Sequence, residues 1–276
     1  PQIQDSEEVI PVSHIDTIEV IAASTMHLSN DEVTTFAIDL GTSYTRAGIV
    51  GYEKPSRQFP TVAVKQKFAN NENEIMIIGE QALSSGKQIP LIQPLYRGRI
   101  IDWDSSMEII KYGMQQVEIN QQHQSNFEDN NLIISVSASC SREDRKKLVQ
   151  YLFETFKFAN VHITDSATLA LYSSGRVTGL VVESGTGSTN VVPVYEGAVM
   201  RHGVQTANFG GDDLTHHLIT LFQERSITLS EAVATDLKER ICYVSQQYEL
   251  ELLKKTMIPY RLPDGKVLKV GSEAFK

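Results

Sequence analysis

Cysteine is scarce in this sequence of 276 residues, which contains only Cys140 and Cys242. The two are far apart and lack the spacing of metal ligands, so we expect reduced thiols in a cytosolic or nuclear protein. Positive charge is also in deficit, and the net charge of −9 argues against a broad surface for nucleic acid or anionic membranes. Long apolar runs are lacking, and no stretch is long enough to span a bilayer.

The sequence does contain one short pattern that occurs twice. Asp39–Thr42 and Glu183–Thr186 each place an acid at the end of an apolar run, and small residues then lead into a second apolar run. Each copy predicts a strand, a tight turn and another strand. Two such turns facing each other offer backbone N–H groups to a polyphosphate, with an acid nearby to hold the water shell of a metal ion. The doubled pattern therefore predicts a nucleotide-binding clamp.

Strand and helix patterns alternate along the chain, which favours an α/β fold. Residues 132–136 predict a buried strand, and Ser141 begins a helix whose apolar face carries Leu148, Leu152 and Phe156. A further helix is predicted after Asp102.

Later in the chain, helices are predicted over residues 167–172, 213–222 and 229–248. The last of these is capped by Ser230 and carries Val233, Leu237, Ile241 and Val244 on one face. Strands are predicted around the turn at Pro263–Gly265, and the polar stretches 69–74 and 121–131 are predicted surface loops.

Eight short motifs together resemble the actin family, and specifically eukaryotic actin-related proteins, from about Thr35 to Lys276. The motifs are Asp39–Gly48, Gln58–Pro60, Gly98–Asp104, Phe153–Phe156, Leu171–Arg176, Val194–Gly197, Lys238–Val244 and Leu262–Gly265. Each is weak alone, but their order favours actin over heat-shock chaperone ATPases or sugar kinases, which share only the phosphate turns.

The resemblance implies an actin-like (ribonuclease H-like) ATPase fold, in which two α/β domains with mixed sheets surround a nucleotide cleft. Residues 1–33 would be an N-terminal extension, either a loose tail or a docking arm. Residues 34–165 would form the first domain, with a small subdomain at 61–96. Residues 166–276 would form the second domain, incomplete because the family's last segment has no counterpart after Lys276.

The resemblance also implies a site for ATP or ADP with Mg²⁺, where Asp39 holds the metal through bound waters. The matching nucleotide-binding residues are Gly41, Thr42, Ser43, Arg46, Gly185, Thr186, Gly187, Gly211, Lys238 and Glu239. Arg46 stands where the family has a phosphate-binding lysine, and its planar guanidinium needs more room and a different angle. Thr186 replaces an acid. For Lys238 and Glu239, a solvated pair on an amphipathic helix is the alternative.

Three positions that organise the hydrolytic water in the family differ in this sequence. Ser166 replaces a glutamine and is too short to reach the same water, and Glu183 replaces an aspartate and adds one methylene. Asn190 replaces a histidine and cannot relay a proton as imidazole does. Such proton-transfer groups commonly contribute about 10²- to 10⁴-fold to rate, so we expect nucleotide binding with little or no hydrolysis.

Assembly is expected to differ from that of actin. Residues 70–74 replace a longer, apolar-tipped loop that grips the next subunit in actin filaments, so a homopolymeric filament is unfavourable. Arg97 also replaces a histidine near the phosphates. We therefore expect a structural subunit of a larger assembly whose partners are protein subunits, including actin or other actin-related proteins. Membranes and sequence-specific nucleic acid are not expected as partners.

The expected location is cytoplasmic and cytoskeleton-associated, with the nucleus as an alternative. Two other functions stay open at this point. One is an active actin-type ATPase that polymerises, and the other is an empty-cleft scaffold in a nuclear chromatin complex.

Overall fold

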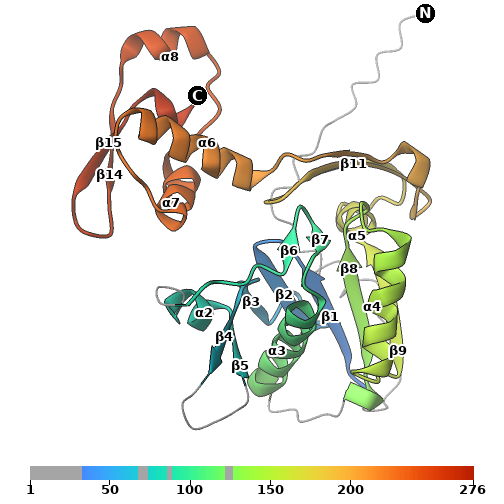
Figure 1. The fold of residues 1–276 in the computed structure, drawn as a ribbon. Coiled ribbons are helices and arrows are strands. Elements are labelled where there is room, and N and C mark those ends of the chain that lie inside the picture. The colour runs from blue at the N-terminus through green and yellow to red at the C-terminus, as the bar shows by residue number, and fades with distance from the viewer. Residues whose placement is uncertain (1–32, 68–73, 86–88, 122–126) are drawn as a thin grey trace, which may run out of the picture. The chain divides into compact units, whose positions relative to one another are not determined.

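The computed structural model describes residues 33–67, 74–85, 89–121 and 127–276 of the chain. It divides into two compact units, one ending at Asn208 and one spanning Phe209–Lys276. Helices and strands of each unit are labelled in Figure 1 where there is room. The predicted domain boundary at residues 165 and 166 remains a prediction.

A mixed five-stranded sheet forms the framework of the first unit. Its strands, in the spatial order β3-β2-β1-β8-β9, are Arg57–Pro60, Tyr44–Ile49, Thr35–Leu40, Asn131–Val136 and Asn160–Asp165. β1, β2 and β3 pair antiparallel, whereas β8 pairs parallel with both β1 and β9. The mixed sheet predicted for the first domain is confirmed. Because parallel strands end at the same edge, the carboxyl ends of β1, β8 and β9 lie together.

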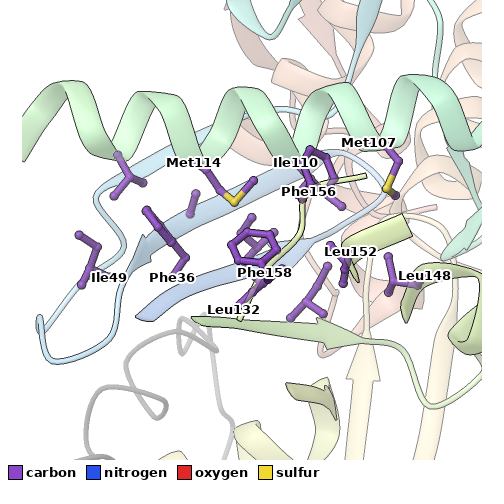
Figure 2. Packing of buried hydrophobic residues seen from close by; sticks show 14 residues of the cluster. Phe36, Ile49, Met107, Ile110, Met114, Leu132, Leu148, Leu152, Phe156 and Phe158 are labelled. Carbon is purple, nitrogen blue, oxygen red and sulfur yellow. The ribbon is translucent and has the colours of Figure 1, made fainter. Parts of the chain in front are cut away.

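Two long helices pack their apolar faces against this sheet. α3 (Trp103–Gln121) contributes Met107, Ile110 and Met114 to the core, and α4 (Arg142–Glu154) contributes Leu148 and Leu152. Figure 2 shows these side chains gathered around Phe36 and Leu132 of the sheet. The predicted helix after Asp102, the cap at Ser141 and the apolar face with Leu148 and Leu152 are therefore confirmed. Phe156, predicted on the same face, is buried in the core but lies beyond the end of α4 at Glu154.

Smaller elements flank the sheet within the first unit. They are the hairpin of β4 (Ala63–Lys67) and β5 (Glu74–Ile78), α2 (Glu80–Ser85), the hairpin of β6 (Leu95–Tyr96) and β7 (Arg99–Ile100), and η1 (Phe127–Asp129). The β6–β7 hairpin carries Arg97 and Gly98 at its tip, and both have positive φ angles, of 53° and 73°.

A second, four-stranded sheet follows in the same unit. After α5 (Ser166–Ser173), its strands are β10 (Gly179–Ser184), β11 (Thr189–Tyr195), β12 (Ala198–Val199) and β13 (Gln205–Ala207), with η2 (Arg201–Gly203) between the last two. All of its described pairings are antiparallel, whereas the resemblance implied a mixed sheet here. The short connections between these strands account for the difference, since parallel pairing requires a crossover.

The second unit is built from helices and one hairpin. Its elements are α6 (Gly211–Glu224), α7 (Glu231–Ile241), α8 (Tyr248–Lys254), β14 (Ile258–Arg261), β15 (Val267–Val270) and η3 (Ser272–Ala274). Leu218 and Phe222 of α6 pack with Leu237 of α7, Tyr260 of β14 and Val270 of β15 in one core cluster. The predicted strands around the turn at residues 263–265 are confirmed.

The helix predicted over residues 229–248 is wrong in its second half. α7 ends at Ile241, and Cys242 adopts an extended conformation with ψ of 146°. The Tyr243 N–H donates to the Ala274 carbonyl at 3.0 Å, and the Tyr243 ring packs against Phe275. These contacts with residues distant in sequence draw the chain out of the helix, and Val244, predicted on the apolar face, is 93% exposed.

Several predictions fall outside the described residues. They concern the N-terminal extension up to residue 32 and the parts of the two predicted surface loops at residues 69–73 and 122–126. Among the helices that the structure describes, none combines the length and the apolar character needed to cross a membrane.

Candidate functional site

The first predicted phosphate turn is closed by a backbone hydrogen bond between β1 and β2. The Gly41 N–H donates to the Tyr44 carbonyl at 3.1 Å. A Cβ atom on Gly41 would lie 2.6 Å from that same carbonyl oxygen, so the turn accepts only glycine there. This closure leaves Thr42 and Ser43 at the tip of the hairpin, as the sequence predicted.

The second predicted turn is closed in the same way between β10 and β11. The Gly185 N–H donates to the Ser188 carbonyl at 2.9 Å, which leaves Thr186 and Gly187 at the tip. Across the hairpin, Glu183 pairs with Asn190 in the ladder that leads into the turn. The two copies of the sequence pattern therefore form two similar hairpin tips.

The two tips converge on each other and on the β6–β7 hairpin. A Cβ atom on Gly187 would lie 3.1 Å from the Thr42 hydroxyl oxygen and 3.0 Å from the Arg97 Cα, so the three segments are in close contact. The Gly98 N–H donates to the Thr42 Oγ1 at 3.2 Å, and the Arg97 Nη1 donates to the Gly187 carbonyl at 3.1 Å. All of these residues belong to the first unit.

The tips present backbone donors at the point where they meet. Within the described parts of the chain, the N–H groups of Thr42, Ser43, Thr186 and Gly187 donate to no backbone carbonyl. Successive N–H groups in such turns form concave anion-binding sites. The described geometry therefore fits a phosphate group.

Asp39, the predicted metal-associated acid, lies at the end of β1 with both carboxylate oxygens in hydrogen bonds. The Arg46 Nη1 lies 3.1 Å from the Asp39 Oδ2, and the Ser135 hydroxyl donates to the Asp39 Oδ1 at 2.5 Å. Arg46 is held from its other side, because its Nε donates to the Gln58 side chain at 3.1 Å. The predicted phosphate ligand Arg46 is thus an ion-pair partner of the predicted metal-associated acid.

The three positions predicted to be degenerate lie around the second sheet and α5. Burial raises the pKa of Glu183 to about 7; a hydrogen bond with Ser166 opposes the rise, and the negative charges of Asp39 and Asp165 add to it. The Asn190 amide donates to the Ser137 hydroxyl at 3.3 Å and accepts from the Thr206 hydroxyl at 2.9 Å.

Asp165 is a member of this region that the sequence analysis did not identify. It ends β9, and its two carboxylate oxygens accept from Arg145 of α4 and Arg201 of η2, both at 2.5 Å. Arg201 also donates to the Ala138 carbonyl at 3.0 Å. Asp165 ends a half-exposed edge strand rather than following an apolar run, so the signal that identified Asp39 was missing here.

Three predicted binding residues lie in the second unit. The Lys238 ammonium donates to the Gly211 carbonyl at 2.8 Å and to the Thr215 hydroxyl at 2.9 Å, which joins α7 to the first turn of α6. Glu239 is exposed on α7. The contacts of Lys238 are those of a residue that ties two helices together, and its role toward a nucleotide remains a prediction.

A small, open hollow lies beside the β6–β7 hairpin, and none of the predicted binding residues lines it. Its walls include Leu40, Leu95, Ile134 and Leu148, with Cys140 among them. Burial raises the pKa of the Cys140 thiol, which therefore stays protonated at neutral pH. The hollow is mainly apolar, and it adjoins the hairpin tips, because Gly98, whose N–H donates to the Thr42 hydroxyl, is among its lining residues.

Metal ligands of the usual kinds are not grouped in the described residues. No three His, Cys, Asp or Glu side chains there lie together in a way that could hold a metal ion.

A comparison with protein-family models matches residues 30–231, more than half of the chain, to the family described as Actin.

Proposed function

This chain belongs to the actin family, and we propose that it is an actin-related structural subunit of a larger assembly that binds ATP or ADP with little or no hydrolysis. Actin-fold proteins generally bind ATP. The single observation that carries the proposal is the meeting of the two hairpin tips, where Gly187 contacts both Thr42 and Arg97.

The backbone donors at the tips support a phosphate-binding role. The donors are the N–H groups of Thr42, Ser43, Thr186 and Gly187. They belong to two hairpins whose tips are in direct contact. A bound nucleotide would bridge the two sheets of the first unit, and it would stabilise the folded state by RT ln(1 + [L]/Kd), where [L] is the free nucleotide concentration. The nucleotide serves here as a structural ligand.

Weak hydrolysis is supported by the hydrogen bonds of the three replaced residues. The Asn190 amide is engaged by Ser137 and Thr206, and an amide does not take up a proton at neutral pH. Glu183 has a pKa of about 7, so it is substantially protonated where the family has an ionised aspartate. These groups are poorly suited to activate a water molecule.

A role as a subunit is supported by exposed apolar side chains on the second sheet. Leu180 and Val182 are 65% and 63% exposed on β10, which lies at the edge of the described sheet. Exposed apolar rows and unpaired strand edges are typical of surfaces that contact another chain. We propose protein partners, among them actin or other actin-related proteins, in a cytoplasmic, cytoskeleton-associated assembly.

Two measurements on the purified protein test this proposal. Nucleotide should remain with the protein through gel filtration, and phosphate release from ATP should stay near the rate of the buffer alone. Turnover close to that of conventional actin would show an active ATPase, and loss of nucleotide on gel filtration together with no thermal stabilisation by ATP would show an empty cleft. Pelleting as homopolymeric filaments would contradict the subunit role.

A further inference from the structure

The carboxylate that would orient a metal's water shell is already paired with a cation. Asp39 lies directly opposite Arg46 in the β1–β2 ladder, and their side chains are 3.1 Å apart. Both side chains are mostly buried, with 17% and 23% of their surfaces exposed, so solvent screens the pair weakly. Ser135, opposite Asp39 on β8, donates to the second carboxylate oxygen.

The position of the Arg46 side chain is fixed independently of Asp39. Its Nε donates to the amide oxygen of Gln58, which lies opposite Arg46 on β3. A guanidinium held by two neighbouring strands loses little further freedom when it contacts an anion. A guanidinium group is not deprotonated in proteins, so this counter-charge is permanent.

The negative charges of Asp165 and Glu183, the other acids of the region, are also reduced or paired. The Asp165 carboxylate accepts from two guanidinium groups, those of Arg145 and Arg201. Glu183 has a raised pKa and therefore carries only part of a negative charge at neutral pH. A divalent cation placed among these groups would meet guanidinium groups already paired with the Asp39 and Asp165 carboxylates. The residues present therefore do not fit a metal held through Asp39.

We propose that the phosphate site at the two hairpin tips binds its nucleotide without a divalent cation, with the Arg46 guanidinium as the fixed counter-charge. This inference rests on the nucleotide binding proposed above. The Asp39 carboxylate then acts on Arg46, holding it in place as a positioning residue. Arg97, which contacts the second tip through the Gly187 carbonyl, adds a further positive charge at the same place.

The test is a fluorescence titration of the full chain with a fluorescent ATP analogue, in excess EDTA and in excess Mg²⁺. We expect the two Kd values to agree within about threefold, and a loss of more than about tenfold in EDTA would overturn the inference. Binding only with Mg²⁺ would overturn the inference and leave the proposed nucleotide binding intact. Binding in neither condition would overturn both.

Two variants separate the roles of the paired residues. Arg46→Ala should weaken binding in EDTA by about tenfold or more, and Mg²⁺ should restore part of the loss because Asp39 is released. Arg176→Ala removes an exposed arginine that follows α5 and is the matched control, expected to bind as the wild type does. Equal affinities of wild type and Arg46→Ala in EDTA would overturn the inference.

Asp39→Asn keeps Arg46 and nearly the same shape, so it tests the inference even if Arg46→Ala does not fold. It should bind the analogue in EDTA at least as tightly as the wild type, because the amide oxygen still accepts from Arg46 but no longer neutralises its charge. A loss beyond about tenfold would show that the carboxylate itself is needed and would overturn the inference. Thermal unfolding with and without the analogue provides a readout independent of fluorescence.

Discussion

Gly187 lies so close to Arg97 that a Cβ atom on the glycine would be 3.0 Å from the Arg97 Cα. The Arg97 side chain returns to the same residue, where its Nη1 donates to the Gly187 carbonyl at 3.1 Å. Arg97 has a φ of 53°, an uncommon conformation for a residue with a side chain. The close approach of Gly187 and the backbone conformation of Arg97 therefore leave no room for a side chain at position 187 of the second hairpin tip.

The close approach predicts that Gly187→Ala separates the hairpin tips. The new methyl group would meet backbone and the Thr42 hydroxyl, so we expect a loss of about 1–3 kcal/mol in unfolding free energy and weaker binding of an ATP analogue. Gly185→Ala in the same turn is the control for the loss of stability alone, since its Cβ would lie 3.6 Å from its nearest neighbour. Chemical denaturation and titration of both variants check this, and equal behaviour would contradict it.

The two arginines that contact the Asp165 carboxylate should contribute unequally to the free energy of unfolding. Arg145 is 21% exposed and Arg201 is 49% exposed, so water replaces the lost contact more readily at Arg201. Asp165→Ala should cost about 3 kcal/mol, because it leaves a mostly buried guanidinium without its ion pair. Arg145→Met should cost more than Arg201→Met. Urea unfolding followed by circular dichroism measures all three, and the reverse order of the arginines would refute the argument.

The parts of the fold that follow from local chemistry were predicted from the sequence. The Ser141 hydroxyl accepts from the Asp144 N–H at 3.0 Å, as its capping pattern implied. Leu148 and Leu152, spaced at one helical turn, are both buried. Capping and periodicity involve neighbours in sequence, so a single chain reveals them.

Contacts between distant residues were not predictable in the same way. The helix ending at Ile241 was extended too far, because Val244 continues the apolar spacing of that helix. The hydrogen bond of Tyr243 with Ala274 favours the end of the helix at Ile241, and no pattern in the neighbouring sequence predicts this bond. α8, which begins at Tyr248 after this break, was missed for the same reason.

The candidate site shows the same division. The doubled pattern predicted both turns, because tight turns require particular residue types. It did not predict that Arg46 would pair with Asp39, since that depends on the register of β1 and β2. Asp165 was overlooked because its partners Arg145 and Arg201 come from elements well separated in sequence.

The contacts of Lys238 predict a stabilising role within the second unit. Lys238→Met removes hydrogen bonds to the Gly211 carbonyl and the Thr215 hydroxyl, so we expect a loss of about 1–3 kcal/mol. Lys269→Met changes an exposed lysine on β15 and should have little effect. Urea denaturation checks the pair, and a Lys238 variant as stable as the control would show that these hydrogen bonds contribute nothing to stability.

The raised pKa of Glu183 makes stability depend on pH in a defined direction. Burial is the main cause, and it raises this pKa from the ordinary 4.5 to about 7. Between these values the folded protein keeps a proton that the unfolded chain releases. The contribution of Glu183 to the free energy of unfolding therefore falls as the pH rises from 4.5 to 7, and it stays constant above that range.

Glu183→Gln should remove this dependence, because the amide keeps the shape of the protonated acid without titrating. We expect the variant to match the wild type near pH 5 and to exceed it by on the order of 2 kcal/mol at pH 8. Glu108→Gln, on the exposed face of α3, is the control and should follow the wild type at both pH values. Urea unfolding at each pH makes the comparison. A Glu183→Gln variant that gains no stability over the wild type between pH 5 and pH 8 would show that the carboxyl of Glu183 ionises at its ordinary pKa in the folded protein.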